Sequence, residues 1–380
     1  MRLLEYEAKE IFRAYGIRTP EGVVCKTPEE AGEAVAKLGS SVIKAQVPVG
    51  GRGLAGGVRF AESPDEAYRL AGEILSKDIK GSRVESLLVE KKVCVSRELY
   101  LSLTIDRASR SLIYIASKIG GVEIEDLARE NPESIIKLNI NPYIGFSPYI
   151  ARTIASFIDL PVQAWGEIER IVAGLYRIMV DYDAELVEIN PLAVDCSGSL
   201  IALDAKILVD DNSLFRHPDL NNLKYRELTS EERSARERGF TYVSLEGYIG
   251  VIGNGAGLTM ATMDLIEFYG GKPANFLDVW SGGGASRDRV KEAVKLLLEN
   301  PRVRVVLVNI FGGMTRCDEV ALGVKQAIEE TGLKKPVVVR LMGTNQEEGA
   351  RILREAGLLV YEDVDEAVRR AVEISRGGVV

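Results

Sequence analysis

The pattern of apolar and polar positions changes character near residue 235. Beyond that point, short apolar runs alternate with amphipathic helical stretches such as 287–298 and 347–356. Because helical stretches follow the apolar runs, this half is expected to form a doubly wound parallel sheet. Its predicted strands are 250–253, 274–279, 303–310, 337–341 and 358–361.

The first half mixes helical and alternating patterns. Apolar residues at helical spacing run from Leu4 to Tyr15, and Gly16 stands where a helix stop belongs. Alternating stretches at 97–106 and 111–117 predict an antiparallel sheet with one buried face. Further expected elements are strands at 41–47, 58–60 and 87–90, and helices at 150–157 and 162–179.

A polar, charge-dense stretch at 210–235 separates these two patterns and is predicted to be a connector. The chain has 380 residues, which suits two or three domains. We therefore predict two domains, 1–235 and 236–380, the first including the connector.

A hairpin is predicted between residues 184 and 206, where two apolar runs flank a polar loop. If Val194 faces Leu200, the same antiparallel register places Asn190 opposite Asp204, with Cβ atoms about 4.5–5.5 Å apart. An amide oxygen beside a carboxylate suits Mg²⁺, which usually takes only one or two protein ligands beside substrate phosphates. An ordinary hairpin with a solvated polar face is the alternative.

The same register places Glu188 opposite Lys206. Since side chains on a strand alternate with period two, these two residues project from the same face as the candidate metal ligands.

A glycine-rich segment at 50–57 follows the strand that carries Lys44. Its backbone N–H groups can approach an anion closely, while Lys44 and Arg52 supply positive charge. The segment is not a Walker loop, because no G-K-S/T follows it. A flexible glycine hairpin without a ligand is the alternative.

Three turns of the second half are also rich in glycine, at 253–257, 281–285 and 311–316. Strand-to-helix turns of a doubly wound sheet form its ligand edge, and each offers free N–H groups and a helix dipole to an anion. The first departs from G-x-G-x-x-G because Leu258 occupies the sixth position. In the third, Thr315 is expected to cap the following helix. Ordinary tight turns are the alternative.

Composition narrows the class of protein. A net charge of −8 without a basic run argues against a nucleic-acid partner, and no apolar run approaches membrane-spanning length. Charged residues of both signs occur within the first seven positions, so no signal peptide is predicted and a cytoplasmic location is expected. The four cysteines lie far apart without C-x-x-C spacing, so all are expected to be reduced and zinc is not expected. A single histidine, His217, argues against a histidine-based metal site or triad.

Taken together, the motifs resemble one family. They are L-x-E-Y-x-A-K, G-G-R-G-x-A-G-G, E-I-N-P-L, L-F-R-x-P-D-L, N-G-A-G-L, A-N-F-L-D-V and V-N-I-F-G-G-x-x-R-C-D, in this order from about residue 1 to 375. This combination resembles the β subunits of succinyl-CoA synthetases. The resemblance implies an N-terminal ATP-grasp domain and a flavodoxin-like CoA-ligase domain that docks on an α subunit. The α subunit would carry the CoA site and a transiently phosphorylated histidine.

The resemblance also implies roles for individual residues. The nucleotide-binding positions are Lys44, Gly51, Arg52, Gly53, Glu90, Val93 and Glu98. The Mg²⁺ ligands are Asn190 and Asp204, and Glu188 corresponds to a glutamate that holds the phosphohistidine. The positions near the organic acid are Asn254, Gly313, Met314 and Thr315, and a helix beginning near Arg316 faces the phosphate with its N-terminus.

The sequence departs from the family pattern at three places. Leu54 stands where many relatives have lysine, Trp280-Ser281 looks inserted before three glycines, and Met314-Thr315 replaces the commoner Ile-Val. Since malate–CoA ligase β subunits share nearly all the motifs, the identity of the acid stays open.

The expected reaction is the reversible conversion of succinate, CoA and ATP to succinyl-CoA, ADP and phosphate, a step of the tricarboxylic acid cycle. Lys44 and Glu188 are the expected catalytic residues, and GTP/GDP could replace ATP/ADP. Because His217 lies in the polar connector, the nucleophile is expected on the α subunit, in an αβ or α2β2 heteromer.

Two other functions are weighed against this one. A self-sufficient ATP-grasp ligase joining a carboxylate to an amine would leave the three glycine turns of the second domain unexplained. A non-catalytic nucleotide-binding or regulatory subunit would have little need of the set Lys44, Asn190 and Asp204.

Overall fold

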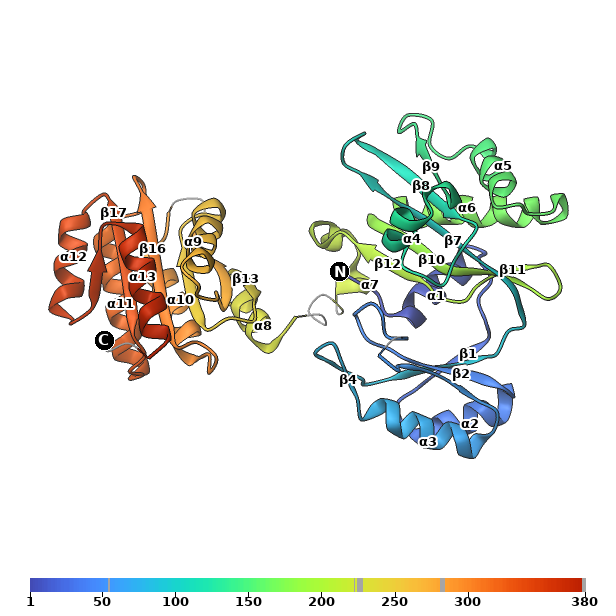
Figure 1. The fold of residues 1–380 in the computed structure, drawn as a ribbon, viewed down its shortest axis with the longest axis horizontal. Coiled ribbons are helices and arrows are strands. Elements are labelled where there is room, and N and C mark those ends of the chain that lie inside the picture. Colours follow the sequence, from blue (N-terminus) through green and yellow to red (C-terminus); the bar gives the residue numbers. More distant parts are fainter. Residues whose placement is uncertain (54, 222, 224–227, 281–283, 378–380) are drawn as a thin grey trace. The chain divides into compact units, whose positions relative to one another are not determined.

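The computed structural model describes the chain except for residues 54, 222, 224–227, 281–283 and 378–380 (Figure 1). The departures predicted at Leu54 and Ser281 therefore lie outside the described residues. The chain forms two compact units, Met1–Glu227 and Leu228–Val380. The boundary expected at 235/236 falls inside helix α8, Ser230–Glu237, whose Ala235 packs in the core of the second unit.

The first unit contains a four-stranded antiparallel sheet with the strand order β1-β6-β2-β3. Its strands are β1 (Gly22–Cys25), β2 (Ser41–Ala45), β3 (Val58–Ala61) and β6 (Leu87–Lys91). Two helices, α2 (Pro28–Leu38) and α3 (Pro64–Leu75), cover one face of this sheet (Figure 1). Ile43 and Ala45 are buried in the core that the helices form with the sheet, and Lys44 points to the opposite side, as predicted.

The larger sheet of the first unit has the order β11-β10-β7-β8-β9, with β12 also pairing with β10. Its strands are β7 (Val95–Asp106), β8 (Ser111–Ser117), β9 (Ile135–Ile140), β10 (Ala184–Asp195), β11 (Leu200–Ala202) and β12 (Lys206–Val209). Three helices bury their apolar faces in its core: α1 (Glu5–Ala14), α5 (Pro148–Phe157) and α6 (Trp165–Asp181). The predicted helices and the strands β7 and β8 are confirmed within a few residues, whereas β9 was not predicted.

The remaining short elements of this unit are β4 (Asp78–Ile79), β5 (Ser82–Arg83), α4 (Ile124–Glu130), α7 (Pro218–Asn221) and the 3-10 turns η1 (Pro132–Ser134), η2 (Val162–Ala164) and η3 (Asp211–Arg216). No helix of the described residues is long and apolar enough to cross a membrane.

Strand β7 corrects the expectation of a single buried face. Leu99, Leu101 and Leu103 lie in the core as predicted, but Tyr100 and Ser102 on the opposite side are also buried. On that side Tyr100 donates a hydrogen bond to Glu188 of the neighbouring strand β10, described below. An alternating pattern shows which residues share a face, but it does not show what covers that face.

The predicted hairpin register is confirmed. Val194 pairs with Leu200, and Glu188 pairs with Lys206 in the same register. The ladder is interrupted between β11 and β12, where a cis peptide bond joins Asn190 to Pro191. Asn190 and Asp204 thus fall at matching positions in the interruption rather than in a continuous ladder.

The second unit is built on one six-stranded sheet with the order β13-β15-β14-β16-β17-β18. Its strands are β13 (Thr241–Ser244), β14 (Ile249–Gly253), β15 (Asn275–Asp278), β16 (Val305–Gly312), β17 (Val337–Gly343) and β18 (Leu359–Tyr361). All pairs are parallel except that of β13 with β15. Numbered along the chain, the five parallel strands have the order 2-1-3-4-5, which is the flavodoxin-like arrangement. The fold prediction is confirmed, with an unpredicted antiparallel edge strand added.

Helices cover both faces of this sheet (Figure 1). One face is buried by α10 (Arg287–Glu299), α11 (Cys317–Thr331) and α12 (Gln346–Glu355), and the other by α9 (Ala256–Phe268) and α13 (Val364–Ser375).

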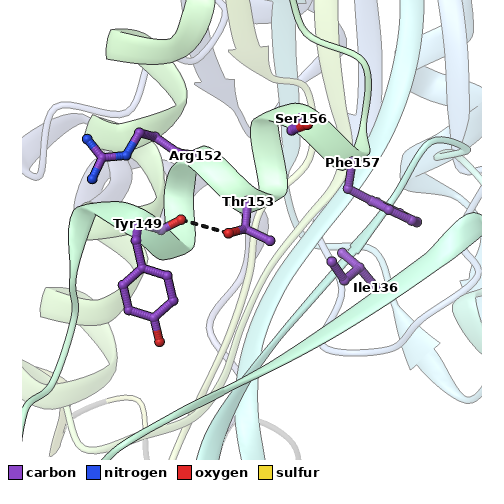
Figure 2. Close-up of a pocket in the computed structure, with 6 residues that line it drawn as sticks. All are labelled: Ile136, Tyr149, Arg152, Thr153, Ser156 and Phe157. Atoms are coloured by element: carbon purple, nitrogen blue, oxygen red, sulfur yellow. Dashed lines mark hydrogen bonds between the residues drawn. The ribbon is translucent and has the colours of Figure 1, made fainter.

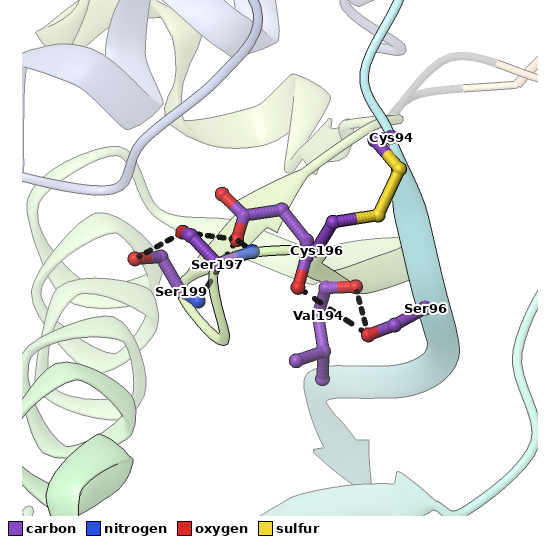
Figure 3. The surroundings of a disulfide bond; sticks show 7 residues. Cys94, Ser96, Val194, Cys196, Ser197 and Ser199 are labelled. Atoms are coloured by element: carbon purple, nitrogen blue, oxygen red, sulfur yellow. Dashed lines mark hydrogen bonds between the residues drawn. A yellow bond between two sulfur atoms is a disulfide. The ribbon is translucent and has the colours of Figure 1, made fainter.

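The expectation of four reduced cysteines is wrong for one pair. Cys94 and Cys196 form a disulfide, with Cα atoms 5.6 Å apart (Figure 3). The pairing of β7 with β10 brings them together, because Val95 lies opposite Asp195. Spacing along the sequence carries no information about this cross-strand neighbourhood. Cys25 and Cys317 are free and buried.

Candidate functional site

Lys44 lies at the centre of a buried ionic cluster in the first unit. Its Nζ atom is 2.9 Å from Glu5 Oε1 and 2.7 Å from Glu90 Oε2, and it donates to the carbonyl oxygen of Leu203 at 2.6 Å. Strand β2 supplies the lysine, α1 and β6 supply the carboxylates, and the carbonyl comes from the hairpin. Residues far apart in sequence are therefore brought to one point.

Arg52 connects the glycine-rich segment to the hairpin. Its guanidinium pairs with Asp204 Oδ1 at 3.0 Å, forms an ion pair with Glu5, and donates to the carbonyl oxygen of Ala45 at 3.0 Å. The predicted anion-binding cation and the predicted metal ligand are thus in direct contact.

The glycines of this segment have a local structural role. Gly51 has φ +74°, a conformation that glycine adopts without strain, and a β-carbon there would lie 3.0 Å from the Nζ atom of Lys80. The carbonyl oxygen of Gly53 accepts a hydrogen bond from the N–H of Gly56. The N–H of Gly57 donates to the carbonyl oxygen of Arg52 at 2.8 Å, and the carbonyl oxygen of Gly57 accepts from the N–H of Ala45, so Gly57 lies between Arg52 and the end of β2.

Glu5 and Lys9 belong to the cluster, although the sequence analysis did not assign them to the site. Lys9 Nζ lies 2.8 Å from Glu5 Oε1 and donates to both carboxylate oxygens of Glu90 at 2.6 Å. A glutamate and a lysine four residues apart share one helix face, which is the sequence signal that could have indicated them. Here the usual interpretation, a solvated helix pair, fails because both side chains are almost fully buried.

The cluster is balanced in charge, with the cations Lys9, Lys44 and Arg52 facing the carboxylates of Glu5, Glu90 and Asp204. Burial by itself raises the pKa of Glu5, but the neighbouring cations outweigh it and hold that pKa well below its ordinary value. Burial lowers the pKa of Lys44, but the carboxylates around it raise that pKa above its ordinary value. Glu5 and Lys44 therefore stay charged, whereas burial lowers the pKa of Lys9 below its ordinary value.

Glu188 lies on the polar face of the larger sheet and is 15% exposed. Tyr100 donates a hydrogen bond to its Oε2 atom at 3.0 Å, and Lys206 Nζ lies 3.7 Å from its Oε1 atom. Burial raises the pKa of Glu188, and this effect outweighs the opposing influence of Lys206 and Tyr100.

Asn190 and Asp204 offer oxygen ligands of the kind that Mg²⁺ prefers. Asn190 Oδ1 accepts from the N–H of Gly121 at 2.7 Å, and an amide oxygen has a second lone pair. Asp204 is 40% exposed, and its Oδ1 atom accepts from Arg52. Among the described residues no group of three or more His, Cys, Asp or Glu could hold a metal ion. One amide oxygen and one carboxylate suit an ion that completes its shell with phosphate oxygens and water.

The other predicted nucleotide residues differ in exposure. Glu90 is buried and engaged by the two lysines of the cluster, whereas Glu98 is exposed and Val93 is half-buried. Val93 precedes Cys94 in the segment between β6 and β7. A β-carbon at Gly121 would lie 2.5 Å from Glu98 Oε2, so Glu98 lies near the backbone that contacts Asn190.

In the second unit, Asn254 and Thr315 are brought together between β14 and β16. Asn254 Nδ2 donates to the carbonyl oxygen of Phe311 at 3.0 Å and to Thr315 Oγ1 at 3.3 Å, and its Oδ1 accepts from the N–H of Phe311 at 2.9 Å. This is the point where the strand order reverses, which is where ligands bind in open α/β sheets. Met314, in the same turn, is 68% exposed, and the carbonyl oxygen of neighbouring Gly313 accepts from Thr344.

The expectation that Thr315 caps the following helix is wrong. Helix α11 begins at Cys317 with Arg316 at the N-cap, and no side chain caps it. Thr315 Oγ1 instead accepts from the N–H of Ala285 at 3.3 Å and from Asn254. The turn continues past the threonine before the helix begins, so the hydroxyl braces two turns against each other.

Replacing Asn254 by aspartate should destabilise the second unit by about 2 kcal/mol, because two donated hydrogen bonds are lost and a carboxylate faces a carbonyl oxygen. Denaturant unfolding of the full chain measures this loss. Thr315→Ser keeps both hydrogen bonds and should lose only about 1 kcal/mol, for one methyl group. Equal stability of N254D and the unsubstituted chain would contradict the bracing role.

A separate hollow of about 560 Å³ lies between α5 and β9 (Figure 2). It is lined by Ile136, Tyr149, Arg152, Thr153, Ser156 and Phe157. Thr153 donates to the carbonyl oxygen of Tyr149 at 2.9 Å. None of the predicted site residues lines it, so we assign it no part in the candidate site.

Comparison with known proteins identifies both units. Residues 2–194 match the family model of the ATP-grasp domain, and residues 252–374 match that of the CoA-ligase domain. In overall fold the chain is similar to ATP citrate lyase from Methanothrix soehngenii in complex with citrate and coenzyme A. That similarity has a TM-score of 0.73 at 19% identity and covers 98% of this chain and 99% of the other.

Sequence relatives are much nearer. The chain is 57% identical to the succinate–CoA ligase (ADP-forming) subunit beta of Desulfurococcus amylolyticus, over 99% of this chain and 100% of that protein. Proteins of the same name from Staphylothermus marinus and a Roseiflexus species are 53% and 48% identical, over 99% of this chain and 99% and 100% of theirs. The resemblance seen in the motifs is confirmed, and the chain belongs to the family of β subunits of succinate–CoA ligases, which are acid–thiol ligases.

Proposed function

We propose that this chain binds a magnesium nucleotide and transfers a phosphoryl group between it and a histidine on a partner α subunit. The whole heteromer then converts succinate, CoA and ATP reversibly to succinyl-CoA, ADP and phosphate. The relatives' names support this reaction, as does the pairing of an ATP-grasp domain with a CoA-ligase domain.

The observation that carries the proposal is the contact of Arg52 with Asp204 beside Lys44. It joins the glycine-rich segment, the strand lysine and the hairpin carboxylate, which three separate sequence patterns had indicated. Phosphoryl transfer is catalysed mainly by positioning and charge neutralisation, and this group of side chains offers both.

Each residue has a part in this mechanism. Lys44 and Arg52 would attract the phosphates, with the N–H groups of Gly51 and Gly53 adding donors. Asn190 and Asp204 would hold the ion. When bound, magnesium supplies charge neutralisation at the phosphate oxygens. Glu188 would accept a hydrogen bond from the partner's imidazole and orient its other nitrogen toward the terminal phosphorus. There the P–N bond forms as the bond to the ADP oxygen breaks.

The nucleophile is proposed to come from the partner because the chain's single histidine is engaged elsewhere. His217 Nε2 lies 2.7 Å from an oxygen of Asp183, and its ring stacks on Tyr182. A phosphate on that nitrogen would displace the carboxylate contact.

Incubation with radiolabelled ATP, with and without the α subunit, tests the proposal. We expect acid-labile phosphate on the α subunit and none on this chain alone. Omitting CoA lets the phosphorylated α subunit accumulate. Succinate, malate or citrate is then added with CoA, and the substrate is the acid that removes the label from the α subunit. GTP in place of ATP tests the nucleotide, and sedimentation separates αβ from α2β2. Robust labelling of this chain without its partner would overturn the proposal.

A further inference from the structure

Tyr100 contacts the candidate catalytic carboxylate from the neighbouring strand. Ser102 of β7 pairs with Glu188 of β10, so Tyr100 is the diagonal cross-strand neighbour of the glutamate, on the same face of the sheet. Its hydroxyl is buried with the rest of the side chain, which is 3% exposed, and it donates to Glu188 Oε2 at 3.0 Å.

The two oxygens of Glu188 are in different surroundings. Oε2 is held by Tyr100, whereas Oε1 lies 3.7 Å from Lys206 Nζ, beyond hydrogen-bond distance. Asp204 and Glu125 of α4 are the other charged groups near this carboxylate. A donor that is hydrogen-bonded to one oxygen fixes the orientation of the carboxylate plane. The second oxygen then remains available to accept from an incoming N–H group.

The tyrosine is suited to this task because it holds the carboxylate without neutralising it. Burial and the charge of Glu188 raise the pKa of Tyr100, so its hydroxyl stays protonated and remains a donor. A lysine or arginine in the place of Tyr100 would add a second positive charge to the one that Lys206 already brings near this carboxylate.

We propose that Tyr100 is a positioning residue that orients Glu188 toward the imidazole of the partner's histidine during phosphoryl transfer. This inference rests on the function proposed above. A purely structural role is the competing explanation, since buried hydroxyl groups generally need a partner.

The experiment is a double-mutant cycle in the assembled heteromer. It measures the single-turnover rate of phosphoryl transfer from the phosphorylated partner subunit to ADP. Tyr100→Phe should slow this step about tenfold, as expected for loss of a hydrogen bond to a charged group, with the dissociation constant for ADP unchanged. Glu188→Gln should slow it more, and Y100F should have no further effect in that background.

Tyr114→Phe is the matched control. Its hydroxyl is also buried in the larger sheet, where it donates to the carbonyl oxygen of Val172 at 2.7 Å away from the candidate site residues. We expect Y114F to keep the transfer rate. Should the Y100F heteromer fail to assemble, Glu188→Asp tests the same contact, because it withdraws the carboxylate from Tyr100 while keeping its charge. E188D should also slow transfer.

The outcomes separate the two proposals. An unchanged rate in E188Q overturns the role of Glu188 itself. If E188Q is slow while Y100F, or E188D in its place, keeps the unsubstituted rate, the positioning role of Tyr100 is wrong. It is equally wrong if Y100F slows transfer by the same factor with glutamate or glutamine at position 188, because a structural role would be additive.

Discussion

Replacing Asp204 by asparagine should weaken the magnesium-dependent part of ADP binding by about tenfold to a hundredfold. Mutating a residue that only hydrogen-bonds to a metal ligand typically lowers metal affinity by about tenfold to a hundredfold. Losing the ligand itself should lower it at least as much. Because Asp204 is 40% exposed and Arg52 keeps its ion pair with Glu5, the variant should fold. Calorimetric titration with ADP, in excess magnesium and in EDTA, measures the two parts separately.

The titration in EDTA is the internal control. Without the metal, ADP should bind to D204N no more weakly than to the unsubstituted chain, because a negative charge near the phosphates has been removed. Magnesium dependence that survives unchanged in D204N would place the ion elsewhere and leave the assignment of Asn190 and Asp204 without support.

Removing the disulfide should produce the largest loss of stability. The bond joins Cys94 to Cys196 across 102 positions of the sequence, and closing a loop of that length restricts the unfolded chain by up to roughly 4–5 kcal/mol. The double variant Cys94→Ser, Cys196→Ser should therefore melt about 10 °C lower in the transition of the first unit. Scanning calorimetry of the full chain under oxidising conditions measures the shift.

Reductant provides the comparison for this prediction. It should lower the melting temperature of the unsubstituted chain toward that of the double variant and leave the variant itself unchanged. Identical melting of the two proteins in oxidising buffer would show that the cross-link contributes nothing to stability.

The fold could be predicted well where the pattern was strong. The parallel strands of the second unit are short apolar runs between helices, and this alternation predicts a doubly wound sheet. The flavodoxin-like strand order was implied only by the family resemblance. The hairpin register was predictable because a one-residue slip would turn Val187 and Ile189 away from the core, where they are buried. In both places the residues that the apolar pattern assigned to the core are the ones buried in the structure.

The features that sequence reasoning missed depend on contacts between distant segments. Glu5 and Lys9 were not assigned to the site, and only the approach of β2 and β6 buries them beside Lys44. The partner of Cys94 was set by the pairing of β7 with β10. No periodicity within a single segment encodes such neighbours, because they arise from the packing of one element on another.

The bond between Arg52 and Asp204 has a consequence for the order of binding events. One carboxylate oxygen serves the guanidinium in this structure, and the same carboxylate is the proposed ligand of a divalent ion. An ion arriving at Asp204 competes with Arg52 for that negative charge and leaves the arginine freer to attract an anion. Cation and nucleotide would then bind cooperatively. A nucleotide without the metal would instead bind to a site in which Asp204 still neutralises Arg52.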